Sequence, residues 1–173
     1  MPALQTFIDD PLRVLRVIRF ATRLGYTLHQ DILDSVKNDQ IQSSFTKKIT
    51  RERIGVEVDK MIQGPDPVRA LELIHQFGFF PLVFSTPEPI SVDAVDARSS
   101  IQYCKMVHSA LEKKLLGFEW SAKDIRFLYL ATTIHPFNGH YVKVKTRSVP
   151  VGKHVILVSL KVFVSFIDHT AFQ

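Results

Sequence analysis

Apolar residues recur at helical spacing along almost the whole chain, and this period limits the possible folds more than any other feature. The first clear case begins where Asp10 precedes Pro11, a pair typical of a helix N-cap followed by proline in the first turn. Apolar side chains follow at positions 14, 17, 18, 21 and 24, and Gly25 is a typical C-terminal stop. The sequence therefore predicts a helix over 11–24.

The same period predicts helices elsewhere, each with its own start or stop signal. Asp66 and Pro67 repeat the first start signal, and Ser121 with Asp124 resembles a capping box. The further predicted helices cover 29–37, 51–63, 67–78, 99–116 and 122–134.

Two stretches lack this pattern, and a third leaves two readings open. Residues 79–98 are predicted to be a connector because three prolines interrupt them, and 135–150 are predicted to be a loop. Residues 151–163 fit a last helix, with a strand as the alternative because β-branched residues cluster there. The predicted fold class is all-α.

Composition limits the partners and the cellular compartments to be expected for the protein. The 173 residues carry a formal net charge of +5, a moderate excess that favours polyanionic partners. One cysteine excludes an intrachain disulfide and fits a reducing, intracellular compartment, without separating cytoplasm, nucleus and mitochondrion. The apolar stretch 155–167 contains Lys161 and is too short for a membrane span, so no membrane partner is expected.

One short segment has functional chemistry. Asp9 and Asp10 stand at a predicted helix start, and Arg13 follows one turn later. A carboxylate acceptor beside a guanidinium donor fork matches the pairing edges of adenine and cytosine, which present an amino donor next to a ring-nitrogen acceptor. The five residues 9–13 alone favour a helix cap and a surface ion pair over base recognition.

Longer strings favour base recognition. DDPLRVLRVIRFATRLGY, residues 9–26, closely resembles the nucleotide-selection motif of the class II tRNA nucleotidyltransferases of eukaryotic type. ITRERIGVEVDKMIQGPDPVRALELIHQFGFF, residues 49–80, is similar to the next motif in the neck of that family. Together the blocks cover about half of the chain, in the family's order and spacing.

The resemblance implies a function and roles for individual residues. It implies addition of C, C and A to tRNA 3′ ends from CTP and ATP, with Asp10 and Arg13 hydrogen-bonding to the incoming base. Asp9 would support that geometry and Arg16 would lie on the same helix, with Arg19 a weaker candidate. The pair Arg53 and Glu57 would brace the neck against this helix, in the simplest case through an interhelix salt bridge.

The resemblance also implies an organisation and an expected absence. Residues 1–84 would be a neck-like nucleotide-selection and RNA-binding domain, 85–98 a connector and 99–173 part of a helical body. The family's catalytic head, with an Asp-x-Asp motif for Mg²⁺, has no counterpart in this sequence. We therefore expect no catalytic or metal-binding residue and no bound cofactor here, and no activity of the chain alone.

Three points stay open. The basic residues Lys143, Lys145 and Arg147 are candidates for tRNA phosphate contacts, and a solvated charge run is an equal alternative. A poly(A)-adding relative and a non-catalytic helical RNA-binding or interaction module are the alternative functions. The sequence does not give the oligomeric state.

Overall fold

The computed structural model describes residues 2–87, 90, 97–115, 117, 119–144 and 146–161, and all structural statements below refer to these residues. Most of them are helical. None of the described helices is long and apolar enough to cross a membrane.

The elements follow one another with short links. The N-terminal helices are α1 (Ala3–Asp9), α2 (Arg13–Leu24), α3 (Gln30–Ser35), α4 (Asp39–Lys48), α5 (Arg51–Ile62), α6 (Pro67–Gln76) and α7 (Phe80–Val83). They are followed by α8 (Ser99–Glu112), α9 (Ala122–Ile134), the 3₁₀ helix η2 (His135–Phe137), strands β1 (Tyr141–Val144) and β2 (Arg147–Pro150), α10 (Val151–His154) and the π-helical turn η3 (Val155–Ser159).

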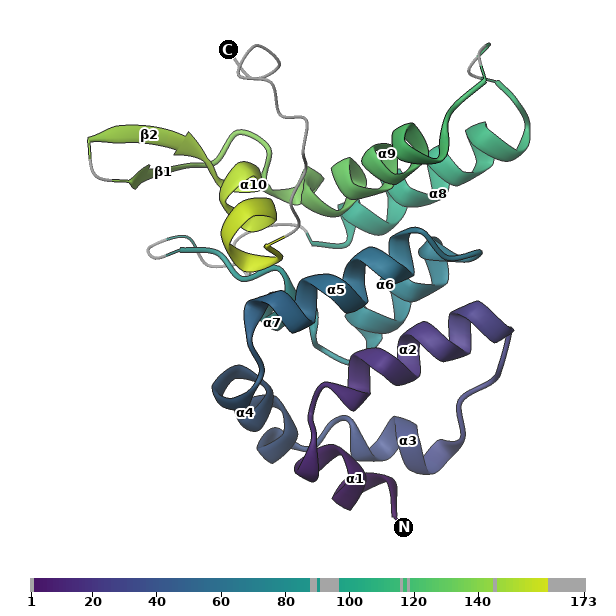
Figure 1. The fold of residues 1–173 in the computed structure, drawn as a ribbon, viewed down its shortest axis with the longest axis vertical. Helices are drawn as coiled ribbons and strands as arrows, with labels where there is room; N and C mark the ends of the chain where they lie inside the picture. The colour runs from purple at the N-terminus through teal and green to yellow at the C-terminus, as the bar shows by residue number, and fades with distance from the viewer. Residues whose placement is uncertain are drawn as a thin grey trace.

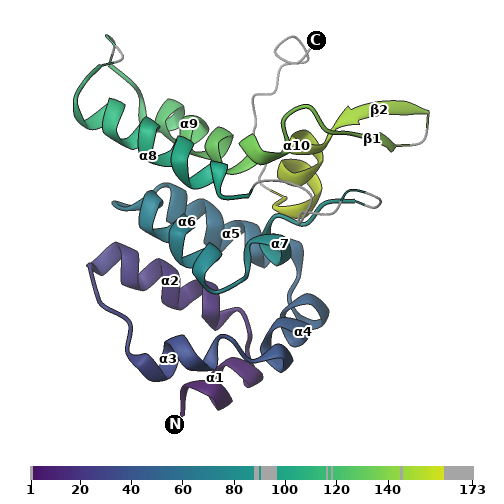
Figure 2. The same cartoon turned by 180° about the vertical axis from the view of Figure 1, so that it is seen from behind.

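The helices stack in successive layers along the long axis of the molecule (Figure 1). At the N-terminal end, α1 packs on α3 and α4; α2 then packs on α5 and α6. The pair α8 and α9 forms the opposite end, joined to the middle layer mainly through α6 and α8. The two strands and α10 lie to one side of the α8–α9 pair, as both views show (Figures 1 and 2).

The core follows from the apolar stripes of these helices. Val14, Leu15 and Ile18 of α2 are completely buried, and α5 contributes Ile54 and Val58. Aromatic rings fill the space around α7 (Phe79, Phe80, Phe84 and Phe137). Buried side chains from both the neck-like and the body-like residues belong to one contiguous cluster. The division at 84 and 99 stays a prediction.

The long helices agree with the sequence analysis. The prediction over 11–24 corresponds to α2, which ends at Gly25 in the left-handed conformation with φ 68°. The helix α6 starts at the capping carboxylate of Asp66, which accepts a hydrogen bond from the backbone N–H of Arg69. The helix α9 starts with the full capping box of Ser121 and Asp124. The all-α prediction is thus confirmed in its main point.

Other local predictions were incomplete or wrong. The helices α1 and α4 were not predicted, and α7 lies inside the stretch assigned to a connector. The loop predicted over 135–150 is wrong, because β1 and β2 pair there as an antiparallel two-stranded ribbon. Of the two readings for 151–163, the helical one holds for the described residues, as α10 and η3.

Candidate functional site

Asp10 lies in the break between α1 and α2. Its backbone is extended, with φ −137°, because Pro11 follows and cannot continue α1. The carboxylate Oδ1 accepts a hydrogen bond from the backbone N–H of Leu12 at 3.3 Å, and the N–H of Arg13 donates to the Asp10 carbonyl at 3.0 Å. The break therefore turns the Asp10 carboxylate toward the first turn of α2.

A second contact holds the same carboxylate from the neighbouring helix. Arg53 Nη2 of α5 lies 3.5 Å from Asp10 Oδ2, and the side chains are 48% and 28% exposed. An ion pair this exposed contributes about 1 kcal/mol or less to stability. Its effect is therefore mainly on the position of the Asp10 carboxylate, relative to α5.

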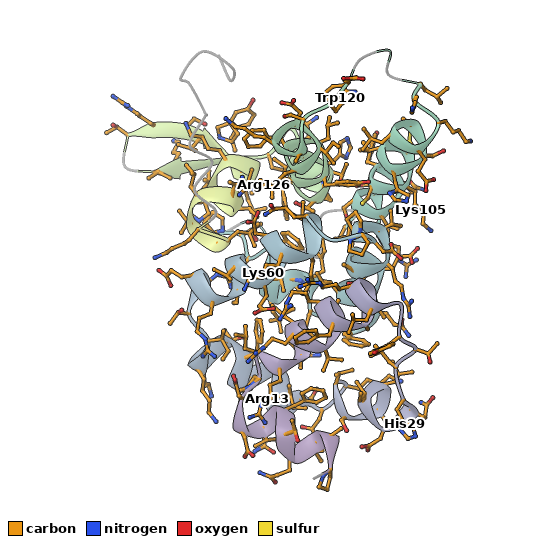
Figure 3. All side chains as sticks on the ribbon, turned by 45° about the vertical axis from the view of Figure 1, so that its right-hand side comes forward. Arg13, His29, Lys60, Lys105, Trp120 and Arg126 are labelled. Carbon is orange, nitrogen blue, oxygen red and sulfur yellow. The ribbon has the colours of Figure 1, made fainter. Side chains whose placement is uncertain are left out.

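Arg13 is held on its other side by α1. Its Nη1 donates to the backbone carbonyl of Thr6 at 3.3 Å, and Figure 3 shows Arg13 at the α1 end of α2. The side chains of Asp10 and Arg13 make no recorded contact with each other, although both are partly exposed. A carboxylate can accept about four hydrogen bonds and a guanidinium can donate five, so both keep unused capacity.

Asp9 and Arg16 are less closely tied to this pair. Asp9 is the exposed last residue of α1, where its Oδ1 accepts a hydrogen bond from Gln5 Nε2 at 2.8 Å. Arg16 is exposed on α2. The structure thus pairs Asp10 with Arg53, while Arg13 has its own contact with α1 at the same chain break. Asp9 and Arg16 contact none of these three side chains in the described residues.

A buried ion pair fixes α2 against α5. Arg19 Nε of α2 lies 2.6 Å from Glu57 Oε2 of α5, with the two residues only 9% and 7% exposed. The Arg19 guanidinium also lies over the ring of Phe20, 4.1 Å from its centroid. Glu57 and Arg53 therefore both join α5 to the α2 segment, each through its own partner. Sequence reasoning had not identified Arg19 as the partner of Glu57.

The start of α5 joins further segments. Arg51 donates from Nη1 and Nη2 to the carbonyls of Leu82 and Val83, and from Nε to the carbonyl of Ser159 at 2.6 Å. Burial lowers the pKa of Arg51. The neighbouring Glu52 pairs with Lys161 at 2.5 Å, and this hydrogen bond lowers the pKa of Glu52 to about 2.

Gly55 allows the backbone at Leu160 to approach α5 closely. A Cβ atom at Gly55 would lie 1.6 Å from the carbonyl oxygen of Leu160, so a larger residue could not be accommodated without a shift. A glycine inside an otherwise strong helical pattern was the available signal for such a close backbone approach. Sequence analysis did not use it.

Two of the three candidate phosphate-binding residues lie on the β1–β2 ribbon. Lys143 is on β1 and Arg147 is on β2, and both are exposed. Their strand register puts them on opposite faces of the ribbon, because Lys143 is opposite Ser148 and Arg147 is opposite Val144. Lys145 lies outside the described residues.

Metal-ligating groups do not gather in the part of the chain that the structure describes. No group of three or more His, Cys, Asp or Glu side chains there could hold a metal ion. The described residues therefore do not fit the carboxylate site that Mg²⁺ prefers.

Comparison with known proteins gives matches along the same residues. A family model described as "Probable RNA and SrmB- binding site of polymerase A" matches residues 29–90. The mitochondrial CCA tRNA nucleotidyltransferase of Saccharomyces cerevisiae is 50% identical over 76 residues, which are 44% of this chain and 14% of that protein. The tRNA nucleotidyltransferase cca1 of Schizosaccharomyces pombe is 36% identical over 135 residues, which are 74% of this chain and 27% of that protein.

In a further relative the matched residues again make up a small share of the protein. The mitochondrial CCA tRNA nucleotidyltransferase of Candida glabrata is 49% identical over 76 residues, again 14% of that protein. The chain therefore spans less than a third of the length of each of these relatives. No solved structure gives a significant match.

Proposed function

Starting from a chain that belongs to the family of the CCA tRNA nucleotidyltransferases, we propose that it forms the base-selecting and RNA-binding part of such an enzyme. In this proposal Asp10 and Arg13 bind the pairing edge of an incoming CTP or ATP. The reaction of the whole enzyme adds CCA to a tRNA 3′ end.

One observation carries the base-selecting role. The Asp10 carboxylate is held from both sides, by the Leu12 N–H and by Arg53, while Arg13 is held by α1 at the other side of the chain break. Groups fixed in this way lose little conformational freedom when a base binds between them. The unused acceptor sites of Asp10 and donors of Arg13 match the amino group and ring nitrogen of A and C.

The buried pair of Arg19 and Glu57 supports this role indirectly. It fixes the rotation of α2 relative to α5, and α5 carries Arg53. Arg19, Glu57 and Arg53 are therefore positioning residues in the proposal, whereas Asp10 and Arg13 contact the base. Arg16 and Asp9 are candidates for weaker contacts at the edge of the same group.

A chimera offers the most direct test. This chain would replace the matching segment of the Saccharomyces cerevisiae enzyme, and incorporation of all four nucleotides into a tRNA lacking CCA would be measured. Asp10→Ala should reduce the preference for CTP and ATP over GTP and UTP by about fivefold or more, since a good bidentate contact provides about 1–3 kcal/mol of base discrimination. Asp39→Ala, which removes an exposed carboxylate at the start of α4, is the matched control. Unchanged selectivity in the Asp10 variant would rule out the template role.

The chain by itself is expected to incorporate no CTP. Mg²⁺ supplies the charge stabilisation and the activated 3′ hydroxyl in phosphoryl transfer of this kind, and the described residues offer no site that fits it. No step through a metal ion is therefore assigned to this chain. CTP incorporation by the purified 173-residue chain would contradict this proposal.

A second candidate function has support of its own. The matched family model, which covers residues 29–90, is described by RNA binding and by polymerase A. This favours a non-catalytic RNA-binding module, or a poly(A)-adding relative, as the alternative. Binding of tRNA by the chain without any measurable affinity for CTP or ATP would favour the module, and a chimera that adds successive A residues would favour the poly(A) relative.

A further inference from the structure

The basic excess of the protein is concentrated in one stretch. Residues 125–161 hold six of the chain's Lys and Arg residues and no Asp or Glu, although the whole chain has 22 against 17. Two of the six are engaged in ion pairs: Arg126 lies 2.7 Å from Asp59, and Lys161 lies 2.5 Å from Glu52. Of the other four, Lys143 lies on β1, Arg147 on β2 and Lys153 on α10, and Lys145 lies outside the described residues.

The strand register gives the ribbon two chemically different faces. Lys143 lies opposite Ser148, and Val144 lies opposite Arg147. Opposite residues share a face and successive residues alternate, so Tyr141, Lys143 and Ser148 lie together on what we call the outer face. Arg147 lies on the other face with Val144.

Burial shows which face is available. On the face that carries Arg147, Val142 is only 8% exposed and Val149 is partly buried, so this end of the face packs against the protein, whereas Val144 and Arg147 at the other end are exposed. On the outer face, Tyr141 is 62% exposed and both Lys143 and Ser148 are exposed. The outer face thus combines an aromatic ring, an ammonium group and a hydroxyl group, all open to solvent.

We propose that this outer face binds RNA, with Lys143 on a backbone phosphate and Tyr141 stacked on an unpaired base. The proposal rests on the RNA-binding role given above and specifies where part of that RNA lies. Aromatic rings that stack on bases and cations that follow the backbone are the two elements of single-stranded RNA recognition. Ser148 adds a hydroxyl group that can bind a phosphate or a ribose 2′-OH.

RNA fits the ribbon better than a membrane surface does. Binding in a membrane interface needs one continuous apolar face opposite a basic one. The exposed apolar side chains Tyr141 and Val144 lie on opposite faces, so the ribbon has no such arrangement. The absence of Asp and Glu from residues 125–161 removes the repulsion that a phosphate backbone would otherwise meet.

The test measures binding of the full 173-residue chain to a fluorescent tRNA lacking CCA, by anisotropy over a range of salt concentrations. Lys143→Ala should lower the slope of log affinity against log salt by about 0.7 to 1, the value for one lost phosphate contact. Tyr141→Ala should weaken binding by about tenfold while Tyr141→Phe retains it, because phenylalanine still stacks. Ser148→Lys should raise the slope, a gain that misfolding cannot imitate.

The matched control is Lys113→Ala. Lys113 is an exposed cation at the C-terminal end of α8, away from the ribbon (Figure 1), and its loss changes the net charge equally. Equal effects of Lys113→Ala and Lys143→Ala would show that only net charge matters and would overturn the ribbon proposal while RNA binding stands. Absence of tRNA binding by the unaltered chain would reject the RNA-binding role as well. Binding to phosphatidylglycerol vesicles in place of tRNA, lost in Lys143→Ala, would instead assign the ribbon to a membrane.

Discussion

The α2–α5 interface and the β1–β2 ribbon use cationic side chains in opposite ways. Residues 1–84 hold 11 Lys and Arg against 10 Asp and Glu, whereas residues 125–161 hold 6 against none. In the interface, Arg19 is buried against Glu57. On the ribbon, Lys143 and Arg147 are exposed, with no ion pair recorded for either among the described residues.

The comparison separates cationic side chains that stabilise the fold from those that are available to a ligand. A buried guanidinium that already has a carboxylate partner fixes two helices and has little left to offer a ligand. An exposed ammonium group without a carboxylate partner contributes little to folding, but it is available to a phosphate. The same residue types therefore position the proposed base-selecting group in one region and are proposed to contact RNA in the other.

The strongest test of this comparison removes Glu57. Glu57→Ala leaves the Arg19 guanidinium buried without its carboxylate, which should destabilise the fold by about 3–5 kcal/mol. Urea unfolding followed by circular dichroism measures the loss. The paired replacement of Arg19→Met with Glu57→Leu should recover most of it, while Lys143→Ala should change stability by less than about 0.5 kcal/mol. Similar stability losses for Glu57→Ala and Lys143→Ala would remove the distinction between the two regions.

A second test concerns the close approach of Leu160, which follows the ribbon and α10 in the chain, to Gly55 of α5. Gly55→Ala places a Cβ atom where the Leu160 carbonyl oxygen now lies, 1.6 Å away, and overpacking of this kind costs up to about 3 kcal/mol. Alanine's better helix propensity offsets about 1 kcal/mol of that cost. Limited proteolysis should show faster cutting after Lys153 in the variant. Val56→Ala, at an exposed position of the same helix, should leave the cutting rate unchanged, and equal rates for both variants would show that the close approach has no role.

A third test concerns Arg51, which is neither a buried ion-paired cation nor a fully exposed one. Arg51 is partly buried and donates to three backbone carbonyls, and no carboxylate partner is recorded for it among the described residues. A lysine cannot reach all three carbonyls, so Arg51→Lys should cost about 1.5 kcal/mol in urea unfolding. Arg16→Lys at an exposed position of α2 is the control and should be neutral. An unchanged midpoint for Arg51→Lys would mean that these hydrogen bonds add nothing to stability.

How much the sequence could predict depended on the kind of signal. Amphipathic helices with clear start and stop residues, such as α2, α6 and α9, could be predicted, because both the apolar period and the capping residues are local in the sequence. The helix α4, which is as long as α6, was missed because only Ile41 and Phe45 mark its apolar stripe. The ribbon was missed too, although Val142 and Val144 alternate as in a strand, because Pro and Gly nearby also indicate a loop.

The candidate site showed the same limit. The residues of the site could be named from the resemblance, but their partners could not. Pairing of Arg19 with Glu57 and of Asp10 with Arg53 depends on how α2 packs on α5, and residues 38 or more positions apart give no local signal of that packing. The role of Arg51 depends in the same way on Ser159, 108 residues away.

The smallest expected effect is a pH dependence of the contact between Glu52 at the start of α5 and Lys161, which follows η3. The hydrogen bond from Lys161 lowers the pKa of Glu52 to about 2, below its ordinary value, so the contact stabilises the folded chain above the unfolded pKa. That contribution is lost as the pH falls toward the folded value. The thermal midpoint of Glu52→Gln should therefore lie slightly below that of the unaltered chain at neutral pH and approach it as the pH falls to about 2. Because Glu52 and Lys161 are both exposed, the effect should also shrink in high salt. A difference between the two proteins that grows as the pH falls would show that Lys161 does not hold residues 155–161 on α5 through this carboxylate.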